Sequence, residues 1–139
     1  MLIKFNQSAV LQMKIDVNRG FFKKKTISET IYTKLSIANG VCDENEVDTK
    51  IQSGIYDWIK EFESQGYYDV VLCQNLETLK KKYPYDTIPD LERCVYLTPT
   101  IEPLSEMKIS EILEMLNAKQ FAQYCRENKI FFENLSKNS

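Results

Sequence analysis

The sequence predicts an α+β domain in which a small mixed sheet of about four strands packs against four to five helices. Three observations lead to this prediction. Strand and helix periods alternate irregularly along the chain, the last third of the chain has a helical period, and 139 residues suit one domain of ordinary size. We therefore expect a single globular domain over residues 1–135 and a frayed tail over residues 136–139.

The N-terminal segment is predicted to form two strands and then a helix. Residues 11–17 alternate strictly between apolar and polar, which is the period of a half-buried strand, and residues 2–5 are expected to pair with them. A turn signal, Asn-Arg-Gly, follows at 18–20. Aliphatic residues then recur on one helix face, which predicts a helix ending at Asn39-Gly40; they are Ile27, Ile31, Leu35 and Ala38.

The middle of the chain is predicted as helix, strand and short helix. Five apolar residues share one face of the first helix, which ends at Gln65-Gly66; they are Val47, Ile51, Ile55, Ile59 and Phe62. Residues 67–73 form a continuous apolar run with two valines and two tyrosines, which favours a buried strand. Asn75 is suited to cap a helix over residues 76–82, and residues 85–89 are expected to be a loop.

The C-terminal third is predicted as a strand followed by two helices. The run Cys94–Thr98 indicates a strand that ends at Pro99. Two apolar stripes at helical spacing follow, and residues 130–132 are expected to form a last strand or a docked tail. The stripes are Ile109, Ile112, Leu113 and Leu116, and then Phe121, Ala122 and Cys125.

Several classes of enzyme are excluded by composition, because the chain contains no histidine. Serine and cysteine hydrolases with a catalytic imidazole, zinc proteases and Cys2His2 fingers all need this residue. The four glycines stand singly, so no phosphate-binding loop is present. We expect no cofactor and no metal. The sequence favours a non-catalytic protein, and an enzyme that uses Asp, Glu, Tyr or Lys stays an open alternative.

The four cysteines indicate a reducing compartment. Cys73 and Cys94 lie inside apolar runs, where a thiol acts as a small hydrophobic group, and neither they nor Cys42 and Cys125 form a CxxC pair. No signal-peptide pattern stands at the N-terminus, and no apolar run approaches 18 residues. We expect a cytoplasmic protein with no membrane association.

An uneven charge distribution leads to the first functional hypothesis, a protein-binding module. Residues 1–40 carry seven basic and two acidic residues, whereas residues 41–79 carry two basic and nine acidic ones. We expect the chain to bind a macromolecular partner stoichiometrically, as an inhibitor, immunity protein, adaptor or phage counter-defence protein does, and the partner to have a basic surface. The predicted contact residues are four acids and two loop tyrosines: Asp43, Glu44, Glu46, Asp48, Tyr83 and Tyr85.

The alternative hypothesis is a protein that binds or processes nucleic acid. Two lysine triplets lie beside aromatic residues, a combination that supplies charge for phosphate and rings for base stacking. They are Lys23, Lys24 and Lys25, and Lys80, Lys81 and Lys82. Asp90, Glu106 and Lys108 also match, loosely, the carboxylate–lysine pattern of metal-dependent nucleases, although the last two lie near a helix start where capping explains them.

Overall fold

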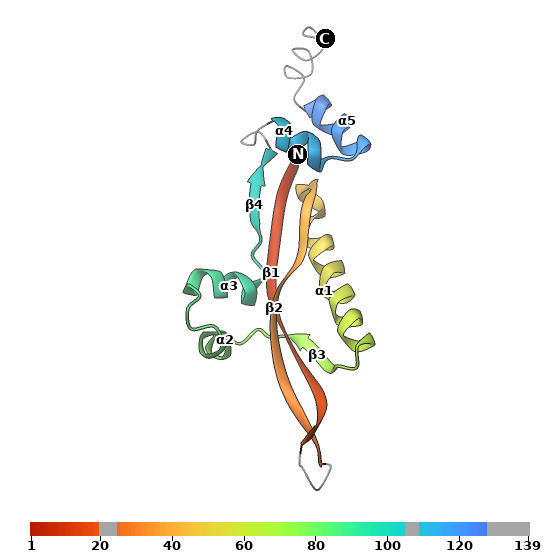
Figure 1. Cartoon of the computed structure of the whole chain (residues 1–139). Helices are drawn as coiled ribbons and strands as arrows, with labels where there is room; N and C mark the ends of the chain where they lie inside the picture. Colours follow the sequence, from red (N-terminus) through yellow and green to blue (C-terminus); the bar gives the residue numbers. More distant parts are fainter. Residues whose placement is uncertain (20–24, 105–108, 128–139) are drawn as a thin grey trace.

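The computed structural model describes residues 1–19, 25–104 and 109–127 (Figure 1). Within these residues it has one four-stranded antiparallel sheet and five α-helices, with helices in the C-terminal part. The α+β class, the number of strands and the helical C-terminal third are therefore confirmed. The predicted tail over 136–139 and the segment 130–132 lie outside the described residues.

A long hairpin of two strands, β1 (Leu2–Arg19) and β2 (Lys25–Asp43), runs through the whole molecule (Figure 1). The two strands are paired from Leu2↔Asp43 to Arg19↔Lys25, with a bulge at Ile37. The two strands predicted over 2–5 and 11–17 are thus one. The helix predicted over 27–38 is wrong, because these residues pair with β1 along their whole length, and their many β-branched side chains suit a strand.

Two short strands pair with the other edge of β1. They are β3 (Tyr68–Leu72), beside Leu11–Lys14, and β4 (Thr100–Pro103), beside Ile3–Asn6. A strand within the predicted range 67–73 is confirmed, but its predicted burial is wrong, because within β3 only Val70 is buried and Val71 is 50% exposed. The sequence does not predict β4, which is short, follows Pro99 and ends at Pro103. β1 is therefore the interior strand and β2 is an edge strand.

One face of the sheet is covered by α1 (Val47–Ser64), which follows a 3-10 turn at Glu44–Glu46 (Figure 1). The helix buries the apolar face that its periodicity predicts. Its buried residues pack on the odd-numbered side chains of β1 and on β2 in one core cluster, made of Ile3, Phe5, Ala9, Ile37, Cys42, Val47, Ile51 and Ile55. Gly66 has a positive φ of 98°, which suits the end of the helix at Gln65.

Gly54 is the point where α1 comes nearest to the bulge of β2. A Cβ built on this glycine would lie 2.1 Å from the carbonyl oxygen of Ile37 and 3.2 Å from Cβ of Ala38. Any larger side chain would collide with backbone, which a rotamer change cannot relieve. Glycine costs helix stability here, by about 1 kcal/mol relative to alanine, but it permits this close packing.

The opposite face of the sheet carries α2 (Leu76–Lys82) and α3 (Ile88–Tyr96). The helix predicted over 76–82 is confirmed, with the Asn75 side chain accepting from the Thr78 N–H. The strand predicted over Cys94–Thr98 is wrong. The Thr87 side chain accepts from the Asp90 N–H and starts α3, so that Cys94 faces the sheet one turn after Leu91. The buried position of Cys73 and Cys94 in the apolar core is confirmed.

A buried glutamine joins the sheet to α3. Gln7 is 1% exposed, and its Nε2 donates to the carbonyl oxygen of Arg93 at 3.0 Å and to that of Ser8 at 2.8 Å. Gln7 lies beside the bulge, where the paired residues shift from Ala38 to Ser36. The bulge therefore coincides with close packing on both faces, of α1 on one and of α3 on the other.

Two helices close the end of the hairpin at which the chain starts. They are α4 (Ile109–Met115) and α5 (Ala118–Glu127), so the two predicted helices are confirmed (Figure 1). Ile112 of the first predicted stripe is buried, whereas Ala122 of the second is exposed and Tyr124 is the buried residue of α5. A separate core cluster joins them to the sheet through Leu2, Leu104, Ile112 and Tyr124. No helix in the described part of the chain is long and apolar enough to cross a membrane.

Candidate protein-binding surfaces

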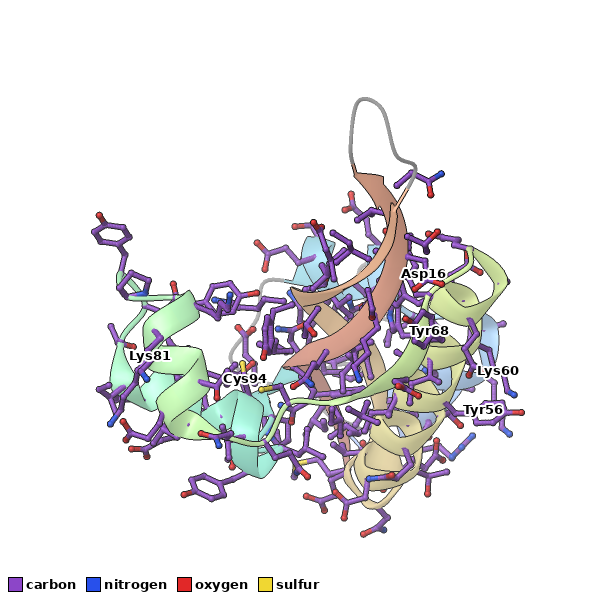
Figure 2. All side chains as sticks on the ribbon, turned by 90° about the horizontal axis from the view of Figure 1, so that it is seen from below. Asp16, Tyr56, Lys60, Tyr68, Lys81 and Cys94 are labelled. Atoms are coloured by element: carbon purple, nitrogen blue, oxygen red, sulfur yellow. The ribbon has the colours of Figure 1, made fainter. Side chains whose placement is uncertain are left out.

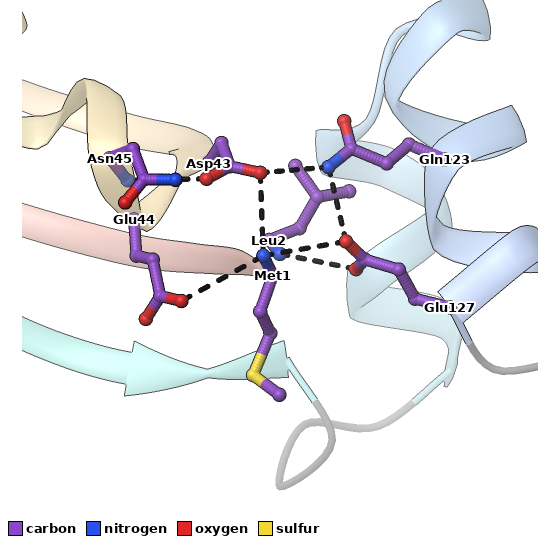
Figure 3. Close-up of polar contacts among 7 residues, drawn as sticks. All are labelled: Met1, Leu2, Asp43, Glu44, Asn45, Gln123 and Glu127. Carbon is purple, nitrogen blue, oxygen red and sulfur yellow. Dashed lines mark hydrogen bonds and ion pairs between the residues drawn. The ribbon is translucent and has the colours of Figure 1, made fainter.

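The acidic residues before α1 divide into one internal carboxylate and several exposed ones. Asp43 accepts from the Asn45 N–H and from Gln123, and it lies 3.3 Å from the N-terminal ammonium (Figure 3). Glu44, Glu46 and Asp48 are exposed. Of the four acids predicted to bind a partner, Asp43 is thus engaged inside the molecule.

The N-terminal ammonium is surrounded by three carboxylates from different elements. It lies 3.3 Å from Asp43, 3.4 Å from Glu127 and 3.9 Å from Glu44 (Figure 3). The Asn45 N–H and the ammonium hold the pKa of Asp43 below its ordinary value. Desolvation acts to lower the pKa of the ammonium, but Asp43 and Glu127 outweigh it and raise that pKa. This group of charges ties β1, β2 and α5 together.

An open groove lies along α1, beside the place where the helix packs on the bulged part of β2. It has a volume of about 540 Å³, and the acids at its rim, Glu46 and Asp57, outnumber the single base, Lys50. Phe5 and Gly54 form its floor with the bulged part of β2. The full lining is Phe5, Ile37, Ala38, Asn39, Asn45, Glu46, Thr49, Lys50, Ser53, Gly54 and Asp57.

The tyrosine loop lies on the other side of the sheet, with α2 and α3. Tyr85 is 99% exposed, whereas Tyr83 packs against the core of this face, with Lys34 Nζ 5.6 Å from its ring centroid. Burial raises the pKa of the Tyr83 hydroxyl. The acids around α1 and the two tyrosines therefore do not form one continuous surface.

An exposed aromatic residue on α1 was not singled out by the sequence. Tyr56 is 61% exposed and lies on the outer side of the helix, with Lys60 Nζ 5.4 Å from its ring centroid (Figure 2). The signal for it is its position in the polar half of the helical repeat. It adds an aromatic group to the same side of the molecule as the exposed acids.

Two lysines of the second triplet, Lys80 and Lys82, have contacts within the chain. Lys80 pairs with Glu77 at 3.3 Å, and Lys82 Nζ lies 4.9 Å from the ring centroid of Tyr32. Lys81 points outward from α2 (Figure 2). Lys25 begins β2, whereas Lys23, Lys24, Glu106 and Lys108 lie outside the described residues. Asp90 is exposed in the first turn of α3.

A small polar pocket lies between β1, β2 and α3, and its chemistry is not that of a nucleophilic site. It has a volume of about 250 Å³ and is lined by Lys34, Asp90, Arg93 and Cys94 among others. Lys34 forms an ion pair with Asp86. Burial raises the pKa of the Cys94 thiol, whereas a cysteine nucleophile needs a lowered one. Within the described residues, no group of three or more acids and cysteines is placed to hold a metal ion.

The far end of the hairpin forms a ribbon of two strands, which we name the arm (residues 15–19 and 25–29). Within the described chain, the last pairing of β3 with β1 is Lys14↔Tyr68, and beyond it β1 and β2 pair only with each other. The Tyr68 hydroxyl lies 2.7 Å from Asp16 Oδ1 and 2.7 Å from Ser28 Oγ (Figure 2). Tyr68 thus joins both strands of the arm at its base.

The outer edge of β2 has few of the features that normally protect an edge strand. No strand among the described residues pairs with it. It contains no proline, and Lys34 is directed to Asp86 and Tyr83. Ile27 is 42% exposed. Unpaired N–H and C=O groups on such an edge are a template for another strand. We name this edge from Thr26 to Ala38, with the adjacent groove, the β2 edge surface.

Comparisons with protein families, with curated proteins and with solved structures gave no match.

Proposed function

We propose that this protein is a non-catalytic protein-binding module that acts by stoichiometric binding, and that its contact site is the β2 edge surface. The observation that carries the proposal is an edge strand of 19 residues whose outer edge has no partner strand among the described residues. Most strands have about 5–6 residues, and a two-stranded ribbon alone is marginally stable in water. Such an edge gains hydrogen bonds when an extended segment of another polypeptide adds a strand to it.

The groove beside the edge supports this mode of binding. In strand addition, backbone hydrogen bonds give affinity, and pockets for alternate side chains give specificity. The groove begins at Ile37 and is rimmed by Glu46 and Asp57, so it suits a segment with small or basic side chains. Glu46 was predicted from sequence as a contact residue, and Asp48 extends the same acidic side of α1.

The other predicted contact residues have secondary parts in this proposal. Tyr83 and Tyr85 lie on the α2–α3 face, so they would belong to a separate contact.

The four cysteines are free thiols, which supports our assignment of the protein to the reducing cytoplasm. Inhibitors, immunity proteins, adaptors and phage counter-defence proteins all act by stoichiometric binding without catalysis.

Affinity capture from host cell extract, followed by mass spectrometry, tests the proposal. The wild-type chain is compared with Ile27→Lys, which places a charge on the edge, and with Tyr96→Lys, which changes an exposed ring on α3 instead. We expect a protein partner that is lost with Ile27→Lys and kept with Tyr96→Lys. Recovery of nucleic acid without a protein partner would contradict the proposal and favour the alternative hypothesis.

A further inference from the structure

We infer that the strand bound on the β2 edge is β2 of a second copy of this chain, in antiparallel register about a twofold axis at Ile31. This inference rests on the proposed function and names its partner. The outer edge of β2 is identical in the two copies. The unpaired N–H and C=O groups of one edge can therefore bond to those of the other. The resulting contact is closed and symmetric.

Symmetry restricts the registers that two β2 strands can adopt. A twofold axis perpendicular to the sheet keeps each side chain on the same face of the sheet in both copies. One residue of β2 therefore lies opposite the same residue of the other copy, and all residues that lie opposite each other share a face. The face toward α1 carries Ile27, Ile31 and Leu35, because Ile31 and Leu35 pack with Trp58 and Ile59 of that helix. The face toward α2 and α3 carries Tyr32.

The register about Ile31 brings aliphatic side chains of the two β2 strands together. It places Ile27 of each copy opposite Leu35 of the other, and Ile31 opposite itself, so aliphatic residues meet on the α1 face. Glu29 lies opposite Thr33. A register about Glu29 would oppose two like charges, which is unfavourable. A register about Ile27 would pair only residues 25–29 within the described strand.

Charge and length also fit a second copy. In this register each arm runs toward the groove of the other copy, because position 25 lies opposite position 37. In the sequence, the strands of the arm end in two basic residues, Arg19 and Lys25, whereas the groove is lined by two acids, Glu46 and Asp57, and one base, Lys50. Residues 27–35 of each copy would pair over about 30 Å at ~3.3 Å per residue. The joined sheet would have two sets of four strands, which is within the usual size of an open sheet.

The first test is the mass of the protein in solution as a function of concentration, measured by analytical ultracentrifugation. The chain mass is 16.3 kDa, and we expect twice this mass at about 10 µM wild-type protein. Ile27→Lys should raise the dissociation constant at least about 100-fold, and Tyr96→Lys should leave it unchanged. A monomer at every concentration up to about 200 µM would overturn the inference, as would a dimer that Ile27→Lys does not weaken.

The second test determines the register by disulfide cross-linking. In a Cys125→Ser background, oxidation with copper phenanthroline should cross-link Ile31→Cys to itself, because this residue lies on the axis. Ile27→Cys alone should not cross-link, but a mixture of Ile27→Cys and Leu35→Cys should. Cross-linking of Ile27→Cys to itself would overturn the register.

Two controls keep these outcomes separate. Should circular dichroism show that Ile31→Cys is unfolded, a mixture of Glu29→Cys and Thr33→Cys tests the same register on the same face. The proposed function is tested independently by capture from extract. A monomeric protein whose host partner is lost with Ile27→Lys would overturn the second copy and leave the proposed function standing.

Discussion

The two ends of the β1–β2 ribbon have the same secondary structure but are stabilised in different ways. Near its start, β1 pairs with strands on both edges, and its side chains Ile3, Phe5 and Ala9 are buried under α1. In the arm, within the described residues, each strand pairs only with its neighbour and Ile27 is partly exposed. Pairing between its two strands alone does not account for the stability of an arm of this length. The covered end of the ribbon is held by the core under α1, whereas the described part of the arm is held mainly by the pairing of its own two strands.

The largest expected effect comes from matched truncations at the two ends of β1. Phe5 is 2% exposed in the α1 core cluster, so Phe5→Ala should lower the free energy of unfolding by about 3–5 kcal/mol. Val17 is only half-buried, so Val17→Ala should cost less than ~1 kcal/mol. Urea denaturation of both variants measures the difference. Equal losses would show that the arm has a core of its own.

Gly54→Ala tests how closely α1 is fixed to the covered part of the ribbon. The added methyl group meets the Ile37 carbonyl oxygen, so we expect a loss of about 2–3 kcal/mol, although alanine is the better helix former. Gln52→Ala, at an exposed position of the same helix, is the control and should change stability by less than ~0.5 kcal/mol. A stabilised Gly54→Ala variant would show that α1 lies farther from the bulge.

Tyr68→Phe tests whether Tyr68 holds the strands of the arm together where the arm meets the covered end of the ribbon. The change removes the hydroxyl that contacts Asp16 and Ser28 but keeps the ring. We expect a loss of at most about 1 kcal/mol in global stability, because the residue is partly exposed. Amide hydrogen exchange should become faster in residues 15–19 and 25–29 and stay unchanged at Leu11. Unchanged exchange in the arm would show that these contacts do not hold its strands.

The smallest expected effect concerns the charges that join α5 to the covered end. The lowered pKa of Asp43 and of Glu127 means that the two carboxylates stabilise the folded state above about pH 4, and this stabilisation is lost as pH falls through their folded pKa values. The raised pKa of the ammonium stabilises the folded state below about pH 8, and this is lost as pH rises through its folded pKa.

Hydrogen exchange in α5 between pH 3 and pH 10, corrected for intrinsic rates, measures this dependence. We expect the highest protection between pH 5 and pH 8. Acetylation of the N-terminus removes the ammonium charge, so it should abolish the change on the alkaline side. An alkaline change that survives acetylation would point to another group.

Local signals predict the helices of this fold better than its sheet. α1 is predicted correctly because its apolar face and its stop signal agree, and α2 because Asn75 caps its start. β2 is not, because Ile27, Ile31 and Leu35 are four residues apart and this spacing fits both a helix face and every second inward position of a strand. The β-branched residues between them were the available signal for a strand. For α3, the cap formed by Thr87 with a following proline was the available signal.

The candidate site was predictable only in part. The sequence indicates the acidity around α1, and Glu46 does rim the groove. It does not reveal the internal use of Asp43, because only the hairpin register brings this residue to the N-terminal ammonium. The sequence does not indicate the open edge of β2, because it predicts a helix over residues 27–38.

The register of the ribbon also orders the folding of the chain. Arg19 and Lys25 are six residues apart in sequence, whereas Leu2 and Asp43 are forty-one apart. Closing a short loop costs less entropy than closing a long one, and a hairpin forms within ~1–10 µs. The ribbon is therefore expected to zip from the arm toward the sheet, so that the part with the fewest contacts forms first. During synthesis the whole hairpin leaves the ribosome before α1, so the outer edge of β2 is exposed at the earliest stage of folding.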